Sequence, residues 1–155
     1  MKKLSIAAIA FAGGLAVAHA ASPTPPLLGP SALSWEQIEA GTGKGFGKPI
    51  FRSPTATLDE LEMHVTHLPV GKEPHPPHKH LEEELVIIKE GTLEAMQSGK
   101  IRRLGPGSVI FQASNQLHGV RNVGDGPAIY YVMRWKSPGV GKGLTPAVAP
   151  APASR

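Results

Sequence analysis

The 155-residue chain contains no cysteine. It can therefore form no disulfide bond, offer no thiolate to a metal ion and carry no lipid on a cysteine beside a cleavage site. A metal site without sulfur ligands would use nitrogen and oxygen, which favours Mn, Fe, Ni, Cu or Zn. Stability has to come from buried apolar side chains or from a bound ion.

Aromatic residues and excess positive charge are also scarce. Aromatic residues make up 5% of the chain, and the formal net charge is only +4. No run of Lys and Arg is longer than two residues, and the two tyrosines and two tryptophans are not interleaved with basic residues. A nucleic-acid-binding surface needs concentrated basic charge and stacking aromatic rings, so nucleic acid is excluded as an expected partner.

The one long apolar run, at residues 4–17, has the flanks of a secretory signal peptide. Lys2 and Lys3 precede it, and a small-any-small site follows at residues 18–20. The run is shorter than the roughly 20 residues that a membrane-spanning helix needs. We expect a signal peptide at residues 1–20, cleavage after Ala20, and a periplasmic or secreted protein without membrane attachment.

Glycine (18) and proline (16) are abundant, which favours frequent turns over long helices. Residues 21–45 form a Pro/Gly-rich segment, in which Ser34 is positioned to cap one short helical turn that Gly41 ends. The Pro/Ala/Gly-rich residues 137–155 are expected to be disordered. A chain of this length suits one compact domain, which we place at residues 46–136.

The compact domain has the residue pattern of short strands separated by turns, with no sustained helical period. We expect eight strands, at residues 48–52, 58–68, 85–89, 92–97, 101–104, 108–112, 118–122 and 128–135. Their spacing is compatible with an antiparallel meander that closes on itself. It predicts an all-β fold, either a jelly roll or a small β-barrel.

Histidines are concentrated in residues 75–80. Residues two apart in an extended segment project to the same side, so His78 and His80 can converge, and Glu84 can share their face. His118 follows a later strand, and a closed barrel could fold it against the first three. Three imidazoles and one carboxylate suit a divalent ion, which in octahedral geometry keeps two positions for water or a bidentate oxygen ligand.

These residues resemble the two motifs of the cupin family. The first motif is a Gly, a His-any-His pair, a Glu and a second Gly, and it is matched by Gly71, His78, His80, Glu84 and Gly91. The second is matched by Gly107, His118 and Asn122, with Ala113 and Asn115 where Pro and Gly are usual. Asn tolerates a left-handed turn, so the change at 115 is mild. The resemblance covers about half of the chain.

The resemblance implies a single-domain cupin jelly-roll β-barrel, also called a double-stranded β-helix. It implies that one divalent metal ion is bound by His78, His80, Glu84 and His118, and that Gly91 and Gly107 shape turns. Cupins of this size are often dimers, so a homodimer is an expectation.

Other polar residues are candidates for contact with a ligand. His64 and His67 differ in parity along one expected strand, so at most one faces the barrel. His64, with Glu62 and Thr66, is the better candidate, and either His64 or Glu62 could move a proton in catalysis. His67 is expected to point outward, and His75 is the weaker candidate. Arg134 is expected to lie at the rim of the barrel. Gln112, Asn115 and Gln116, near His118, could orient a polar ligand or equally be turn residues.

The resemblance implies no single reaction, because cupins include dioxygenases, isomerases, lyases, decarboxylases, metal-free epimerases and storage proteins. We expect an exported metal-binding cupin that acts on a small molecule as a dioxygenase-like or isomerase/lyase-type metalloenzyme. The alternative is a non-catalytic module that binds a sugar or organic acid and carries a structural metal. Neither a Gly-any-Ser-any-Gly motif nor a phosphate-binding loop is present, which disfavours a hydrolase.

Overall fold

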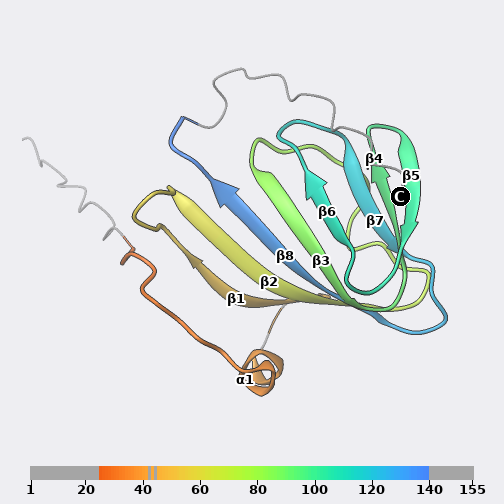
Figure 1. Cartoon of the computed structure of the whole chain (residues 1–155), viewed down its shortest axis with the longest axis horizontal. Helices are drawn as coiled ribbons and strands as arrows, with labels where there is room; N and C mark the ends of the chain where they lie inside the picture. Colours follow the sequence, from red (N-terminus) through yellow and green to blue (C-terminus); the bar gives the residue numbers. More distant parts are fainter. Residues whose placement is uncertain (1–24, 42, 44, 140–155) are drawn as a thin grey trace, which may run out of the picture.

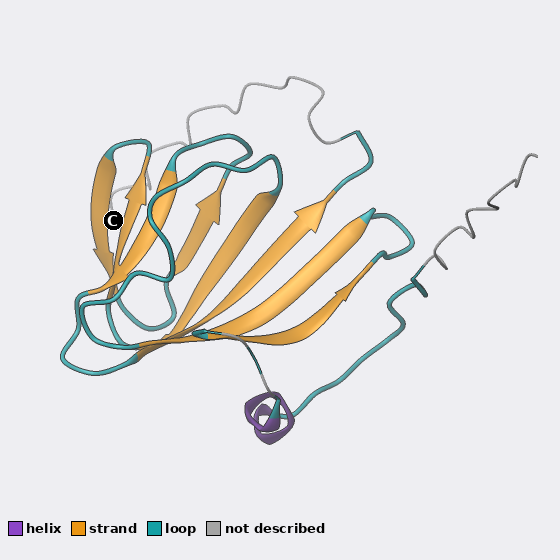
Figure 2. Cartoon of the chain, turned by 180° about the vertical axis from the view of Figure 1, so that it is seen from behind, coloured by secondary structure: helices purple, strands orange, loops and turns teal. Residues whose placement is uncertain are grey.

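The computed structural model describes residues 25–41, 43 and 45–139, and the expected signal peptide and most of the expected tail lie outside them. Two antiparallel sheets pack against each other (Figure 1, Figure 2). The larger sheet has the order β1 (Gly47–Ser53), β2 (Glu60–Leu68), β8 (Ala128–Lys136), β3 (Glu83–Glu90) and β6 (Val109–Gln112). The smaller has the order β5 (Lys100–Leu104), β4 (Leu93–Gln97) and β7 (His118–Asn122).

All eight predicted strands are present, and the all-β prediction is confirmed. The strand order is that of a jelly roll, so the meander interpretation is wrong. Only β1–β2 and β4–β5 pair as consecutive strands, whereas β8 lies between β2 and β3. The chain crosses repeatedly between the two sheets, and these crossings bring segments that are distant in sequence together around one core.

The predicted short helix is α1 (Trp35–Ala40). The Ser34 hydroxyl accepts a hydrogen bond from the Gln37 backbone N–H (3.3 Å), and the Gln37 side chain accepts one from the Ser34 N–H (2.7 Å). This reciprocal capping box satisfies N–H groups that the helix start leaves unpaired. Gly41 ends the helix as predicted.

Helix α1 covers part of the outer face of the five-stranded sheet. The Trp35 ring lies 6.3 Å from the His67 ring and 6.2 Å from the Tyr131 ring, measured between centroids. His67 therefore points outward, as predicted. Within the described part of the chain, no helix has the length and apolar character needed to cross a membrane.

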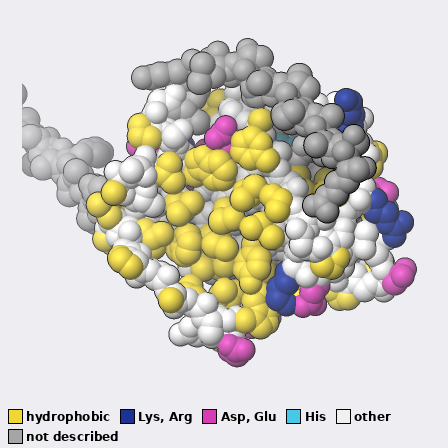
Figure 3. Space-filling view, in the orientation of Figure 1, with side chains coloured by type: hydrophobic (Ala, Val, Ile, Leu, Met, Phe, Trp, Pro, Cys, Tyr) yellow, Lys and Arg dark blue, Asp and Glu magenta, His cyan; other side chains and the backbone are white. Residues whose placement is uncertain are grey.

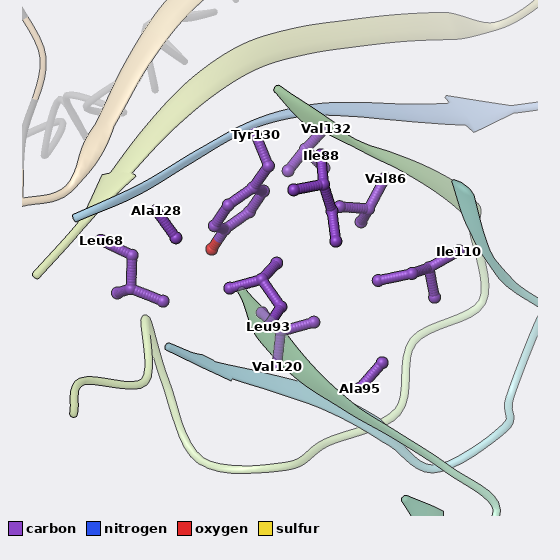
Figure 4. Close-up of a cluster of buried hydrophobic side chains, with 10 residues drawn as sticks. All are labelled: Leu68, Val86, Ile88, Leu93, Ala95, Ile110, Val120, Ala128, Tyr130 and Val132. Atoms are coloured by element: carbon purple, nitrogen blue, oxygen red, sulfur yellow. The ribbon is translucent and has the colours of Figure 1, made fainter. Parts of the chain in front are cut away.

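Buried apolar side chains from both sheets form the core (Figure 4). Tyr130 and Val132 on β8 are 2% and 5% exposed, which identifies the inner face of that strand. Each such side chain contributes roughly 1.5–3 kcal/mol when it is fully buried. The complete cluster is Leu68, Val86, Ile88, Leu93, Ala95, Ile110, Val120, Ala128, Tyr130 and Val132.

The outer face of the five-stranded sheet is also apolar. The register places Met63, Met133, Leu85 and Phe111 side by side on four neighbouring strands. Phe111 is 49% exposed, and apolar side chains gather over this part of the molecule in the space-filling view (Figure 3). The sheet therefore has two apolar faces, of which the inner one belongs to the core.

Three turn positions have the left-handed backbone that the sequence motifs predict. Gly91 has φ +81°, and a Cβ there would lie 2.7 Å from the Ala128 Cα, so the turn has no room for a side chain. Gly107 has φ +78° and Asn115 has φ 59°. Asn115 thus adopts the conformation usual for the glycine that it replaces.

Candidate metal centre

The four predicted ligands come from three places in the chain. His78 and His80 lie in the extended segment between β2 and β3, Glu84 lies near the start of β3, and His118 is the first residue of β7. The backbone N–H of His78 donates to the carbonyl of His118 (3.0 Å), and that of His118 donates back to His78 (3.1 Å). This two-bond bridge holds the His78 segment against β7.

Three imidazoles form a compact cluster. The candidate ligand atoms of His78, His80 and His118 lie within 4.8 Å of one another. The ring centroids of His78 and His80 are 4.7 Å each from that of His118. Glu84 lies beside the cluster, with its Oε2 atom 3.6 Å from Nε2 of His80. The structure thus brings the three histidines together and places the glutamate at their edge.

Backbone carbonyls orient two of the three rings. Nδ1 of His80 donates to the carbonyl of Glu82 (2.8 Å), and Nδ1 of His118 donates to the carbonyl of Gln116 (2.8 Å). A carbonyl oxygen only accepts hydrogen bonds, so Nδ1 carries a proton in both rings, and in the neutral form of each ring Nε2 has the free lone pair. Such an outer hydrogen bond is what fixes the ring orientation of metal-binding histidines.

The site contains buried polar atoms that the protein does not satisfy. Within the described residues, four buried side-chain atoms have no hydrogen-bond partner: His78 Nδ1, His80 Nε2, His118 Nε2 and Gln112 Oε1. An unsatisfied buried group costs about 1–3 kcal/mol. A divalent ion would satisfy the three ring nitrogens, so the residues fit a metal that prefers nitrogen and oxygen ligands.

Burial favours the metal-binding form of two of the three imidazoles, His78 and His118. Burial lowers the pKa of His78 to about 4, and positive charge on His75, His118 and His80 would lower it further. Burial likewise lowers the pKa of His118. Neutral imidazole is the metal-binding form, so a pKa of about 4 keeps the His78 ring in that form at neutral pH, and the lowered pKa of His118 favours the same form.

A cavity of about 420 Å³ opens beside the cluster, a volume within the range of small-molecule pockets. Its apolar lining comes from the core: Val86, Val120, Tyr130 and Val132. Its polar lining comes from both sheets and the loops: His64, Thr66, His75, His78, Glu84, Gln112, His118 and Arg134. His64 and Thr66, two of the three candidates for the inner face, thus both line the cavity.

Glu62 lies between two residues that line this cavity. It accepts hydrogen bonds from Arg134 and from Nδ1 of His64, the latter at 3.2 Å. The bond from His64 and the positive charge of Arg134 lower the pKa of Glu62 to about 2, against the opposing effect of burial. Glu62 is thus ionised at neutral pH and is absent from the cavity lining.

Two residues contribute more to the site than their sequence positions indicate. His75 lines the cavity, and its ring centroid is 4.2 Å from that of His78, although the sequence predicts only a proline-bounded loop there. Arg134 lines the cavity and is paired with Glu62. The available signal for Arg134 was its parity with Tyr130 and Val132 on the same strand.

Comparisons with known proteins agree with this architecture. A family model described as "Cupin domain" matches residues 64–134. No curated protein matches the chain. Among solved structures, the cupin domain of Schizosaccharomyces pombe Cnp3 is 15% identical, with a TM-score of 0.52; the match covers 59% of this chain and 64% of that one. The chain therefore spans less than two thirds of that domain.

For two other solved structures, the match covers a larger share of both chains. BH2720 from Bacillus halodurans is 15% identical with a TM-score of 0.57, and the match covers 72% of this chain and 86% of that one. An uncharacterized protein with a double-stranded β-helix domain from Klebsiella pneumoniae is 20% identical with a TM-score of 0.56, covering 73% and 95%. At these identities the likeness shows the fold alone.

Proposed function

Because this chain contains a cupin domain in which three histidines converge beside a cavity, we propose that it binds one divalent metal ion and uses it on a small molecule. The proposed ligands are His78, His80, Glu84 and His118. One observation carries the proposal. Every buried side-chain polar atom that lacks a partner in the described residues belongs to a ligand histidine or to Gln112 beside them.

Glu84 completes the proposed ligand set. Its carboxylate lies 3.6 Å from a ring nitrogen of His80 and lines the same cavity. A carboxylate beside three imidazole ligands supplies the negative charge that favours retention of a divalent cation. When bound, the ion would supply Lewis acidity or, for a redox-active metal, electron transfer to oxygen ligands of a small molecule.

The protein's own residues support proton transfer next to this site. His64 lines the cavity, and Glu62 holds its Nδ1, which leaves Nε2 to exchange a proton with a bound molecule. A carboxylate with a pKa of about 2 is a weak base at neutral pH. Of the two predicted catalytic residues, we therefore assign proton transfer to His64 and positioning of His64 to Glu62.

The proposed activity is that of a dioxygenase-like or isomerase/lyase-type metalloenzyme. The test is metal analysis of the purified protein, followed by oxygen uptake and product detection with diols, enols and phenols. Turnover that His118→Ala abolishes, and that His64→Gln lowers at least tenfold in kcat with metal retained, would support the proposal. Inertness of every metal-loaded form would contradict an enzymatic role.

A second function, that of a non-catalytic binding module with a structural metal, is favoured by the state of Glu62. This carboxylate is ionised and held by two hydrogen bonds, as expected for a structural ion pair. Equilibrium dialysis distinguishes the two functions. A retained sugar or organic acid whose mass is unchanged after long incubation supports a binding module, whereas chemical conversion of that ligand excludes it.

We further propose that the protein is exported to the periplasm or secreted. The proposal rests on the residue pattern of the first 20 positions. Mass spectrometry of the protein expressed from its full sequence tests it. A mature N-terminus at Ala21 supports export, and a cytoplasmic product that retains residues 1–20 contradicts it.

A further inference from the structure

A row of polar side chains crosses the five-stranded sheet beside the proposed metal site. The register pairs Glu62 with Arg134, Arg134 with Glu84, and Glu84 with Gln112. The adjacent row on the same face is mostly apolar: His64, Val132, Val86 and Ile110. Arg134, Glu84 and Gln112 of this polar strip line the cavity, and the row next to the strip is mostly apolar.

The guanidinium of Arg134, within this strip, has N–H groups that make no hydrogen bond to the protein in the described residues. A guanidinium carries five N–H groups in a planar fork. Among the described residues, this guanidinium makes a single hydrogen bond, from Nη2 to Glu62. Its side chain is 30% exposed and lines the cavity. The remaining N–H groups can bind a carboxylate through two parallel hydrogen bonds.

The charges around the cavity favour a monoanion once the ion is bound. Arg134 and the ionised Glu62 cancel each other. A divalent ion with the Glu84 carboxylate then leaves one positive charge, because the histidine ligands are neutral. Removing the ion would take two positive charges away from the cavity and so weaken its attraction for an anion.

Gln112 adds a requirement for a hydrogen-bond donor on the ligand. The residue is 4% exposed and lines the cavity, and its Oε1 is buried without a partner. An amide oxygen accepts hydrogen bonds, so a hydroxyl group of a ligand would satisfy it. Glu84 lies between Gln112 and Arg134 in the strip, so one molecule at the metal site has both residues as neighbours.

We propose that the cavity binds a small hydroxy acid as its monoanion. The carboxylate binds the guanidinium of Arg134, the hydroxyl donates to Oε1 of Gln112, and the apolar body lies against Val86, Val132 and Tyr130. This inference rests on the metal-binding function proposed above, because the bound ion provides the excess positive charge.

The test uses three matched probes on zinc-loaded protein in isothermal titration calorimetry. Mandelate carries both groups, phenylacetate lacks the hydroxyl, and 1-phenylethane-1,2-diol lacks the carboxylate. We expect mandelate to bind at least tenfold more tightly than the diol and several-fold more tightly than phenylacetate. Chelated protein should bind mandelate at least tenfold more weakly than the zinc-loaded form.

Substitutions of Arg134 and Gln112 test the proposed contacts with the carboxylate and the hydroxyl of the ligand. Arg134→Gln should weaken mandelate binding at least tenfold, and Arg134→Lys, which keeps the charge but loses the fork, should weaken it less. Arg102→Gln is the matched control, because Arg102 is exposed on β5 and should leave the Kd within twofold of the wild type. Gln112→Leu should remove the preference for mandelate over phenylacetate.

Elemental analysis of each sample separates the two proposals. A wild-type protein that takes up no zinc overturns the metal site and this inference together. One equivalent of zinc with no mandelate binding, or with equal mandelate affinity in wild type, Arg134→Gln and Arg134→Lys, overturns this inference and leaves the metal site standing. Equal mandelate affinity with and without zinc also overturns it.

Discussion

His118 and Asn122 lie at opposite ends of β7. The buried side chain of Asn122 is hydrogen-bonded to the protein, whereas a buried ring nitrogen of His118 has no such bond among the described residues. Asn122 is 0% exposed, and its amide is fully used. Its Nδ2 donates to the carbonyls of Leu68 (2.8 Å) and Gly126 (2.9 Å), and its Oδ1 accepts from the Gly124 N–H (3.0 Å). His118 is 3% exposed, yet its Nε2 has no partner in the described part of the protein.

The difference in hydrogen bonding indicates a structural role for Asn122 and a ligand-binding role for His118. At the Asn122 end, the buried side chain ties β7 to the end of β2 and to the turn before β8. At the His118 end, four buried polar atoms are left unpaired beside a cavity. Buried polar groups in folded proteins are almost always hydrogen-bonded, so a cluster of exceptions calls for a partner from outside the chain.

The largest effect should come from removing a metal ligand. His118→Ala should lower the bound metal from about one equivalent to near zero and should remove stabilisation by metal. An ion at 1,000 times its Kd stabilises the native state by about 4 kcal/mol, so thermal unfolding with added metal and with chelator gives the readout.

His67→Ala is the matched control for this substitution. His67 points outward and contacts Glu39 at 2.8 Å, so this variant should keep its metal. One tightly bound equivalent of metal in His118→Ala would show that the imidazole of His118 is not a ligand.

The next largest effect should come from the opposite end of β7. Asn122→Ala removes three hydrogen bonds made by a fully buried side chain, which should cost about 3 kcal/mol of unfolding free energy. Urea unfolding of the metal-free protein measures this loss. A cost below about 1 kcal/mol would contradict the structural role given to this side chain.

A smaller, pH-dependent effect on the unfolding free energy should come from substituting Glu62. Its pKa is lowered from 4.5 to about 2 in the folded protein, so its stabilising contribution is complete above pH 4.5 and is lost as the pH falls toward 2. The contribution is at most about 3 kcal/mol.

The measurement compares urea unfolding of metal-free wild type and Glu62→Gln as a function of pH. The two proteins should differ most above pH 4.5 and converge as the pH falls toward 2. A constant difference across this range would show that ionisation of Glu62 does not stabilise the fold.

The sequence predicts most of the local structure and the ligand histidines. Alternation along each strand identifies which side chains share a face. It makes His64 the better candidate for the inner face and predicts that His67 points outward, and His64 lines the cavity whereas His67 packs against Trp35. The His-any-His spacing is also local, because both residues lie in one extended segment. Such patterns depend on neighbours in the chain, which is why a single sequence is sufficient to read them.

Features that depend on which strands become neighbours could not be predicted. The polar strip exists because β8 lies between β2 and β3, which pairs Arg134 with both Glu62 and Glu84. Periodicity assigns a face to each residue but does not specify the order of strands in a sheet. The position of His75 depends on how a proline-bounded loop folds, and no periodic pattern encodes that.

The smallest effect should come from Gln112→Met in the metal-free protein. Gln112 is buried like Asn122, at 4% exposed against 0%, but its Oε1 has no hydrogen bond to lose, and methionine has a similar shape. The unfolding free energy should change by less than about 1 kcal/mol. A loss as large as that of Asn122→Ala would remove the distinction between the two ends of β7.

The most direct measurement is a crystal structure of the protein grown with zinc, with anomalous scattering recorded at the zinc absorption edge. We predict one strong anomalous peak, bound by ring nitrogens of His78, His80 and His118 and by the carboxylate of Glu84. A structure with no anomalous peak at these residues, or with the zinc bound at a different set of residues, would contradict the proposed metal centre.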